Sequence, residues 1–382
     1  MTERTTGRTR DSALVRRLCS WFGANARGLP WRTPGPSTRR DPYRTLVSEI
    51  MLQQTQVSRV VEKFEPFLAR FPSVQALASA PEDAVLAEWT GLGYYRRARS
   101  LQAAARQVVD EHRGEIPRRV EPLLTLKGVG RYTAGAIASI AFDEPAPIVD
   151  GNVTRVVLRL EGRPLASDDK GAIALSWRRA TDLVTVAGVS RAQGVSPGNL
   201  NESLMELGAT VCTPSNPACD RCPVSDACRA HADGTQNDIP KPKTRAVKKP
   251  LYAATLLWRR DGRTAVEQRP ASGLWAGLWQ APTIERDDRP PAADELAALA
   301  DLPAVTPTAR FGFATTHRAI SFEVYTPAAR AGTASPQPST DRFHWKTQEQ
   351  IASLALSSPQ KRLLLAEPSL FEQVETGTSD GG

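Results

Sequence analysis

Residues Leu124 to Arg155 read LTLKGVGRYTAGAIASIAFDEPAPIVDGNVTR, and this stretch decides the fold of the first half of the chain. Gly128 and Gly130 precede a run of small and apolar residues, which predicts a tight turn at the start of a helix. Bare backbone N–H groups and the positive end of the helix dipole suit a phosphate at such a turn. An ordinary glycine turn between two packed helices accounts for the same pattern equally well.

Asp150 lies near the end of this stretch and favours a functional site. It follows the apolar residues Pro147–Val149 and precedes Gly151 and Asn152. A carboxylate next to a core is costly unless it is paired or has a task, so the position indicates a function. Asp is also a good helix N-cap, and the two roles are compatible in one residue.

Composition limits the classes of protein to consider. With 382 residues the chain is long enough for two domains, and its net charge of +8 with a pI near 9.4 favours a polyanionic partner. It contains no apolar run of roughly eighteen residues and no secretory signal, so we expect a cytoplasmic protein without membrane contact. Five cysteines in so long a chain argue against a disulfide scaffold.

Helix signals place a second carboxyl group beside apolar residues. A helix is expected over Ser12–Ala26, and Asp41-Pro42 is typical of an N-cap followed by the first helical residue. In the helix that follows, Glu49 falls at the edge of the apolar face. Half-burial would raise the pKa of this carboxyl group and allow it to give a proton near neutral pH. A solvated surface glutamate is the alternative.

Four cysteines lie close together with the spacing Cys-x6-Cys-x2-Cys-x5-Cys, namely Cys212, Cys219, Cys222 and Cys228. Clustered thiolates are unfavourable without a metal, so the spacing predicts a metal site. Zinc ribbons usually carry two separated Cys-x2-Cys pairs, which this pattern does not. A structural zinc ion is the less favoured alternative.

Four patterns in the chain resemble segments of known DNA repair enzymes. LKGVG followed by DGNVTR is similar to the LPGVG and DGNVxR segments of the helix-hairpin-helix DNA glycosylases, with Lys127 where that family usually has proline. SEIMLQQTQV (48–57) and WTGLGYYRRAR (89–99) resemble segments of the MutY-type adenine glycosylases. In the second segment we expect glycines to open a helix that carries both tyrosines. The cysteine spacing resembles the 4Fe–4S loop of endonuclease III-type and MutY-type enzymes.

The resemblance implies roles for individual residues. Glu49 would be the general acid, Asp150 would stabilise the oxocarbenium ion, and Tyr132 would replace the Schiff-base lysine of bifunctional relatives. The further residues implied are Asn152 at the catalytic site; Trp31, Arg32, Gln53, Gln54 and Glu202 around the flipped base; Tyr94 as the wedge in the duplex; Gly128 and Gly130 at a phosphate; Thr316 and His317 at 8-oxoguanine; and the four cysteines at a 4Fe–4S cluster. Glu202 as an ordinary helix surface residue is the alternative for that position.

The expected fold is a mostly α helix-hairpin-helix glycosylase domain with a 4Fe–4S loop, followed by an α+β domain that resembles the Nudix-like domain of MutY-type enzymes. Thr315-Thr316-His317 stands where that family has Phe-Ser-His. Glu285 and Glu295 stand alone instead of in a Glu-rich magnesium box, so no pyrophosphatase activity is expected. The predicted ranges are a disordered arm (1–11), the glycosylase domain (12–230, with the loop 212–228), a basic linker (231–250), the Nudix-like domain (251–367) and a tail (368–382).

The resemblance implies a monofunctional glycosylase that removes adenine opposite 8-oxoguanine or guanine in double-stranded DNA. We expect a monomer. One alternative is an endonuclease III-like glycosylase and lyase acting on oxidised pyrimidines. Another is a non-enzymatic iron–sulfur DNA-binding protein, which leaves Glu49 and Asp150 unexplained.

Overall fold

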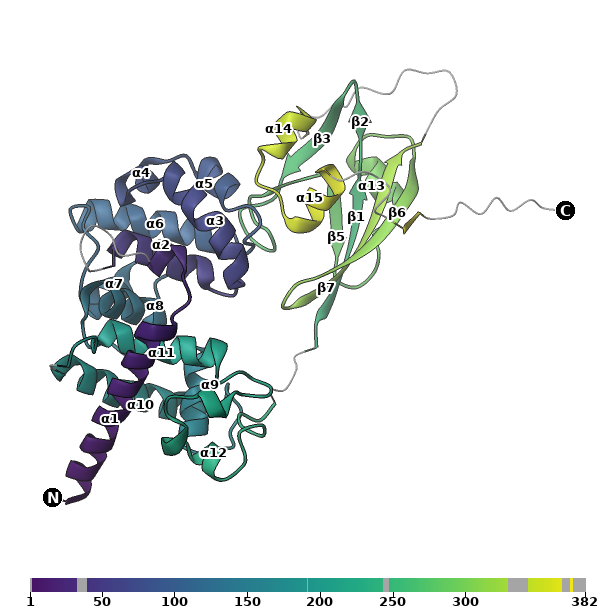
Figure 1. Cartoon of the computed structure of the whole chain (residues 1–382). Helices are drawn as coiled ribbons and strands as arrows, with labels where there is room; N and C mark the ends of the chain where they lie inside the picture. The colour runs from purple at the N-terminus through teal and green to yellow at the C-terminus, as the bar shows by residue number, and fades with distance from the viewer. Residues whose placement is uncertain are drawn as a thin grey trace. The chain divides into compact units, whose positions relative to one another are not determined.

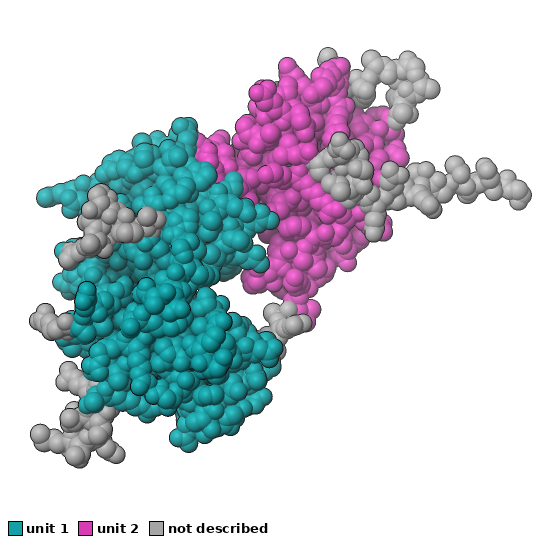
Figure 2. All heavy atoms as spheres, viewed as in Figure 1, with its two compact units in different colours: residues 1–81, 97–244 teal, residues 82–96, 245–382 magenta. Residues whose placement is uncertain are grey.

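The computed structural model describes residues 2–32, 40–190, 192–242, 247–328, 343–365 and 372–373. The chain forms two compact units, which Figure 2 distinguishes by colour. Unit 1 comprises residues 1–81 and 97–244, and unit 2 comprises residues 82–96 and 245–382. Residues 82–96, expected in the glycosylase domain, thus group with unit 2, where the Tyr95 hydroxyl donates to the Leu356 carbonyl at 2.6 Å.

Unit 1 is helical, as the sequence predicts (Figure 1). The expectation of a disordered arm over residues 1–11 is wrong, because the first helix already begins at Thr2. The elements are α1 (Thr2–Asn25), η1 (Pro30–Arg32), α2 (Pro42–Leu52), α3 (Val57–Arg70), α4 (Val74–Ser79), α6 (Arg96–Glu111), α7 (Val120–Thr125), α8 (Arg131–Ala136), the π-helix η2 (Ile137–Ala141), α9 (Gly151–Leu160), α10 (Lys170–Val189), α11 (Pro197–Thr210), η3 (Cys219–Arg221), η4 (Ser225–Ala227) and α12 (Arg229–Ala232).

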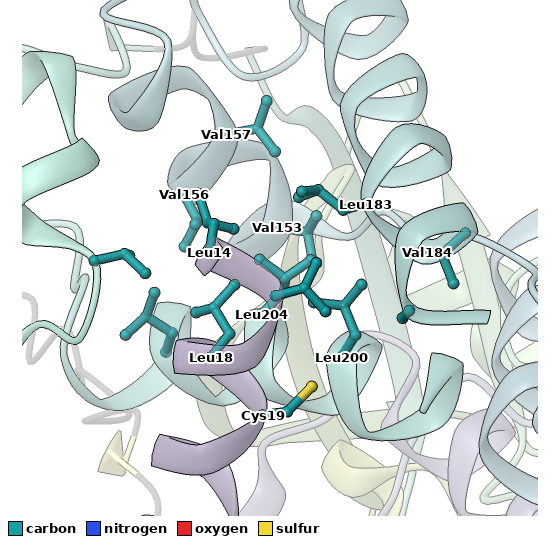
Figure 3. Packing of buried hydrophobic residues seen from close by; sticks show 14 of the residues in the cluster. Leu14, Leu18, Cys19, Val153, Val156, Val157, Leu183, Val184, Leu200 and Leu204 are labelled. Atoms are coloured by element: carbon teal, nitrogen blue, oxygen red, sulfur yellow. The ribbon is translucent and has the colours of Figure 1, made fainter. Parts of the chain in front are cut away.

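The core of unit 1 joins α1 to three helices from later in the chain. Leu14 and Leu18 of α1 pack with Val153 of α9, Leu183 of α10 and Leu204 of α11 (Figure 3). These side chains are at most 6% exposed, and each buried aliphatic side chain contributes roughly 1.5–3 kcal/mol to folding. The packing places the start of α9, where Asp150 lies, beside α11.

Helix α2 begins as the sequence predicts. Asp41 is its N-cap and accepts a hydrogen bond from the Arg44 backbone N–H at 2.9 Å, and Pro42 is the first helical residue. The helix ends at Leu52, so the amide-rich residues 53–56 form the break before α3. Glu49 is therefore in the last turns of a helix whose neighbouring side chains are buried.

The predicted helical hairpin is present as α7, a glycine turn and α8. Gly128 has φ +78°, which favours glycine, and a Cβ added there would lie 2.5 Å from the Ser100 Cβ. Gly130 is the N-cap of α8 with φ −94°, and nothing lies within 4 Å of a Cβ added there. The two glycines therefore have different structural requirements, and only the first turn position excludes a side chain.

Close backbone contact also brings α11 against the start of α9. A Cβ added to Gly208 would lie 2.6 Å from the Asn152 Cβ and 3.1 Å from its Cα. At Gly198, near the other end of α11, an added Cβ would lie 2.7 Å from the Ser139 carbonyl oxygen. Helix α11 therefore approaches η2 and α9 through positions that have no side chain.

Unit 2 is the α+β unit and contains two sheets in the part of it that is described. One has the strand order β5-β1-β7-β6-β9, with β1 and β7 parallel and the other pairs antiparallel; in the other, β3 pairs with β2, β4 and β8. The elements are α5 (Glu82–Glu88), β1 (Lys249–Leu256), β2 (Arg259–Arg260), β3 (Arg263–Gln268), β4 (Trp279–Gln280), β5 (Thr283–Arg286), α13 (Ala293–Leu299), β6 (Val305–Ala314), β7 (Arg318–Pro327), β8 (His344–Thr347), α14 (Gln348–Ala352), α15 (Ser358–Leu365) and β9 (Glu372–Gln373).

Helices cover both faces of the larger sheet. Ala253 packs in a cluster with residues of α14 and α15, whereas its neighbour Ala254 packs with residues of α13. The expected tail, residues 368–382, lies outside the described residues except for β9. Among the described residues, no helix has the length and apolar content that crossing a bilayer requires.

The hairpin turn makes a testable prediction about stability. Gly128→Ala forces a side chain into a left-handed conformation and against Ser100, so we expect a loss of about 1–3 kcal/mol in the free energy of unfolding. Gly130→Ala is the matched control and should change it by less than about 1 kcal/mol. Urea unfolding of both variants measures the difference, and equal losses would contradict this account of the turn.

Candidate active site

A cavity of about 590 Å³ opens in unit 1 and gathers most of the predicted site residues. Its walls come from η1, α2, the break after α2, α8, the start of α9 and α11. The predicted residues that line it are Trp31, Arg32, Glu49, Gln53, Gln54, Tyr132, Asp150, Asn152 and Glu202. The sequence thus identified the side chains of one cavity although they are spread over more than half of unit 1.

Glu49 is buried in this cavity, with 5% of its surface exposed. Within the described residues its Oε2 atom has no hydrogen-bond partner. Burial raises the pKa of Glu49 to about 7, and the negative charges of Glu202 and Asp150 act in the same direction. The neighbouring Tyr132 hydroxyl and the positive charge of Arg32 partly oppose the shift. The expected raised pKa is therefore supported by the environment, and the alternative of a solvated surface residue is wrong.

Asp150 is also buried but has better support for its charge. It is the N-cap of α9 and accepts hydrogen bonds from the Val153 N–H at 2.7 Å and from Asn152 Nδ2 at 3.0 Å. Burial raises the pKa of Asp150 above its ordinary value, and these hydrogen bonds offset part of the shift. The cavity therefore holds two carboxyl groups in unlike environments, one with an unpartnered oxygen and one held at a helix N-terminus.

The charges of both carboxyl groups act on the hydroxyl of Tyr132. Burial raises the pKa of its hydroxyl well above the ordinary value, and the charges of Glu49 and Asp150 add to this effect. The hydroxyl donates to Met205 Sδ at 3.1 Å. A neutral phenol in this position can donate a hydrogen bond but has no amine with which to form an imine.

The two glutamines after α2 have different environments. Gln53 donates from Nε2 to the Thr133 hydroxyl at 3.2 Å, which fixes it against α8. Gln54 is exposed and has φ +54°, an uncommon conformation for a residue with a side chain. The exposed amide and its strained backbone lie at the rim of the cavity.

A row of ion pairs forms one wall of the cavity. Glu202 accepts hydrogen bonds from Arg32 Nε and Arg40 Nη2, each at 2.9 Å. Glu206 accepts from Arg27 Nε at 2.7 Å and from Arg32 Nη2 at 3.0 Å. Glu202 is thus buried and paired, so its alternative as an ordinary helix surface residue is wrong. Sequence reasoning missed Arg27, Arg40 and Glu206, although the spacing of four residues between Glu202 and Glu206 places both on one face of a helix.

A chain of hydrogen bonds along α9 connects the cavity to the cysteine loop. Arg155 donates to Asn152 Oδ1 at 2.9 Å and to the Cys212 carbonyl at 2.8 Å, and Asn152 in turn bonds Asp150. Arg159, 1% exposed, donates to Cys212 Sγ at 3.3 Å and to the carbonyl oxygens of Thr213 and Pro214. Sequence reasoning missed both arginines, whose spacing of four residues is again that of one helix face.

The four predicted cysteines lie on one loop around η3 and η4, and none forms a disulfide. Their thiols influence one another: burial raises the pKa of Cys222, and the nearby charges of Cys212, Cys228 and Cys219 raise it further. Among the described residues, no group of three or more His, Cys, Asp or Glu side chains, these four cysteines included, is arranged to hold a metal ion. Four sulfur donors with an arginine N–H directed at one of them suit an iron–sulfur cluster.

The remaining predicted residues lie outside the cavity. Gly128 and Gly130 form the exposed hairpin turn, with Lys127 on its surface. Tyr94 belongs to unit 2 and is 46% exposed with φ +49°. The expectation that Tyr94 and Tyr95 lie within a helix is wrong, because the loop continues to Tyr95 and α6 begins at Arg96. Gly91 and Gly93 have positive φ angles, which do not occur within a right-handed helix, so this segment forms a loop.

The loop between β6 and β7 carries the two residues predicted to read 8-oxoguanine. Thr316 and His317 are both exposed at its tip. The Thr316 hydroxyl forms a short hydrogen bond with the Tyr94 hydroxyl inside unit 2. Glu285 and Glu295, the isolated acids of this unit, form ion pairs with Arg269 and Arg286.

Comparison with known proteins gives three matching families along the chain. Residues 47–179 match the HhH-GPD superfamily of base excision DNA repair proteins, residues 212–228 the iron-sulfur binding domain of endonuclease III, and residues 253–366 the NUDIX domain. The adenine DNA glycosylase of Rattus norvegicus is 34% identical over 97% of this chain and 80% of its own length. The chain belongs to the adenine DNA glycosylase family.

A second adenine DNA glycosylase and one solved structure are also similar to the chain. The adenine DNA glycosylase of Mycolicibacterium smegmatis is 42% identical over 57% of this chain and 69% of its own length. The solved structure of a thermostable thymine-DNA glycosylase is 26% identical, has a TM-score of 0.50, and covers 59% of this chain and 98% of its own. The expected order of a helical glycosylase domain and a Nudix-like domain is confirmed. The expected 4Fe–4S cofactor is also confirmed, and the iron-sulfur match over residues 212–228 spans the four predicted cysteines.

Arg159 provides a test of how the cysteine loop is held. Replacing it with Gln removes donors to Cys212 Sγ, Thr213 O and Pro214 O from a buried position, so we expect about 3 kcal/mol less stability and less iron per chain. Arg163→Gln, a nearby exposed position, is the control. Iron analysis and thermal unfolding measure the effect, and full iron content in Arg159→Gln would refute it.

Glu49 provides a test through pH-dependent stability. Folding raises its pKa from 4.5 to about 7, so the unfolded chain releases this proton at a lower pH than the folded chain. Wild-type stability should therefore fall as pH rises from about 4.5 to 7, by about 3 kcal/mol from this group. Glu49→Gln removes the effect, and its unfolding free energy should exceed that of the wild type at pH 8 but hardly at pH 5. Denaturant unfolding at both pH values measures it, and an equal difference at the two would exclude a neutral buried Glu49.

Proposed function

We propose that the protein hydrolyses the N-glycosidic bond of adenine paired with 8-oxoguanine or guanine in double-stranded DNA. The observation that carries the proposal is the cavity that holds Glu49 and Asp150 in unlike environments. A base must leave the duplex to be cleaved, and a cavity of about 590 Å³ has room for one purine base and its sugar. The choice of adenine as the base that is removed rests on membership of the adenine DNA glycosylase family.

Glu49 is proposed as the general acid. Adenine leaves as a neutral base only if a ring nitrogen is protonated as the glycosidic bond breaks. The pKa of about 7 keeps the Glu49 proton available near neutral pH, and Oε2, which has no hydrogen-bond partner among the described residues, can face a substrate. The reaction should therefore slow as the pH rises above 7, because the proton donor is lost.

Asp150 is proposed as the stabilising anion. Cleavage leaves positive charge on the sugar, and a carboxylate in a low-dielectric cavity stabilises that charge. The hydrogen bonds from Val153 and Asn152 favour the ionised form of Asp150 and fix its direction. The same carboxylate would orient the water that completes hydrolysis.

Tyr132 makes a monofunctional enzyme the better reading. Bifunctional relatives use a lysine amine here, and a phenol cannot form the Schiff base that leads to strand cleavage. Lys127, the nearby amine of the hairpin, does not line the cavity. The endonuclease III-like alternative is therefore not favoured.

Other residues are proposed to bind DNA outside the cavity. Gly128 and Gly130 would place backbone N–H groups at a phosphate, Tyr94 would wedge into the duplex, and Thr316 with His317 would read 8-oxoguanine through hydroxyl and imidazole groups. Their exposed positions support these roles. The 4Fe–4S cluster on the four cysteines would fold their loop without taking part in hydrolysis. The protein would act as a monomer in the cytoplasm.

Release of free adenine from a duplex tests the proposal. The wild type should release adenine from A opposite 8-oxoguanine, with alkali or heat revealing abasic sites afterwards and no covalent adduct after borohydride. Glu49→Gln and Asp150→Asn should each lower the single-turnover rate by at least about 100-fold, the usual contribution of a positioned acid or of an electrostatic stabiliser. Glu62→Gln, which removes an exposed carboxylate of α3, is the matched control.

The outcomes separate the alternatives. Adduct formation with borohydride would favour a lyase, and tight DNA binding without base release would favour a non-enzymatic protein. Wild-type rates in Glu49→Gln would show that another group protonates the base. Equal rates on A opposite 8-oxoguanine and A opposite guanine would exclude a lesion-reading role for Thr316 and His317.

A further inference from the structure

We propose that Glu206 is a positioning residue of the active site, which holds the Arg32 guanidinium so that Arg32 and Glu202 face the flipped base in one fixed arrangement. The inference rests on the proposed glycosylase function. Glu206 lines the cavity and its side chain has no exposed surface, yet nothing in the chemistry above uses it.

The geometry makes Glu206 the common acceptor of two arginines. One oxygen accepts the Arg27 backbone N–H at 3.0 Å and Arg27 Nε at 2.7 Å, and the other accepts Arg27 Nη2 at 2.9 Å and Arg32 Nη2 at 3.0 Å. Although burial alone would raise the pKa of Glu206, these donors lower it to about 2, so the carboxylate keeps its charge. Glu206 is therefore a buried, permanently charged anion in the row of ion pairs that lines the cavity.

Arg32 is divided between the two glutamates of α11. Its Nε donates to Glu202 and its Nη2 to Glu206, and its guanidinium lies over the Phe22 ring at 5.1 Å. The planar guanidinium cannot rotate without breaking one of these bonds. Glu202 takes its second donor from Arg40. The alternating charges Arg27, Glu206, Arg32, Glu202 and Arg40 thus form one connected row.

The row also bears on the proton of Glu49. The ionisable groups that face Glu49 are Tyr132 of α8, Glu202 of α11, Asp150 at the start of α9 and Arg32 of η1. Glu206 balances part of the charge on Arg32, which otherwise favours ionised Glu49. Without the negative charge of Glu206, the positive charge of Arg32 should act more strongly on Glu49, so Glu49 should lose its proton at a lower pH.

Two variants of the full-length protein test the role, because they should shift the pH–rate profile in opposite directions. Glu206→Gln should reduce the single-turnover rate at pH 7 by about ten- to a hundredfold and move the alkaline limb of the pH–rate profile to lower pH. Arg27→Met removes the other partner of Glu206 and should move the same limb to higher pH. Glu161→Gln, which removes a glutamate paired with Arg179 away from the cavity, is the matched control.

Binding measurements separate positioning from general damage. A duplex with 2′-fluoroadenosine opposite 8-oxoguanine presents an uncleaved base, whereas a duplex with a tetrahydrofuran abasic site leaves the cavity without one. Glu206→Gln should bind the first about tenfold more weakly than the wild type and the second equally well. Iron content and the melting temperature establish that each variant is folded.

The results distinguish failure of this inference from failure of the proposed function. No adenine release by the wild type would overturn the function itself. An active wild type whose pH limb is unmoved in both variants would overturn the role of Glu206, because a purely structural residue lowers the rate equally at every pH. Should Glu206→Gln not fold, the Arg27→Met profile alone decides, and a limb that stays in place or moves to lower pH overturns the inference.

Discussion

The helical unit depends on how it compensates the carboxyl groups that folding removes from water. A buried carboxylate is unfavourable unless it is neutralised or hydrogen-bonded, and the cavity meets this condition in three ways. Glu49 has a pKa raised to about 7, Asp150 accepts the Val153 N–H at the start of α9, and Glu202 and Glu206 are paired with arginines. The first arrangement gives an acid, the second gives an oriented anion, and the third gives a fixed row of ion pairs. The division of labour in the site follows from how each charge is compensated.

The same helix that orients Asp150 also carries the arginines that hold the cysteine loop. From Asn152 through Arg155 to Cys212, each contact is a hydrogen bond between buried or half-buried groups. The cysteine loop is therefore connected to the Asp150 carboxylate through a chain of hydrogen bonds. A disturbance of Cys212 would reach Asp150 through α9, which gives a structural reason for the two features to occur in one unit.

Much of this could be predicted from local sequence patterns, and the remainder needed long-range contacts. The Asp41-Pro42 helix start and the glycine hairpin follow from short-range rules of capping and turns. Periodicity left Glu49 between a surface and a buried position, and the resemblance of residues 48–57 to a MutY-type segment is what indicated the cavity. Arg27 and Arg40 could not be predicted in the same way, because their partners on α11 lie more than 160 residues away. The first helix was expected to begin late because its Thr- and Arg-rich start lacks an apolar face, and hydrophobic periodicity is the main signal available.

The contact at Gly208 determines how the cavity responds to thermal motion. There the backbone of α11 lies directly against Asn152, with no intervening side chain whose rotamer could change. The separation between the glutamates of α11 and the carboxylate at the start of α9 is consequently as stiff as the two helices themselves. The proposed catalytic groups therefore keep their arrangement in the free protein, and binding energy need not be diverted to assembling it.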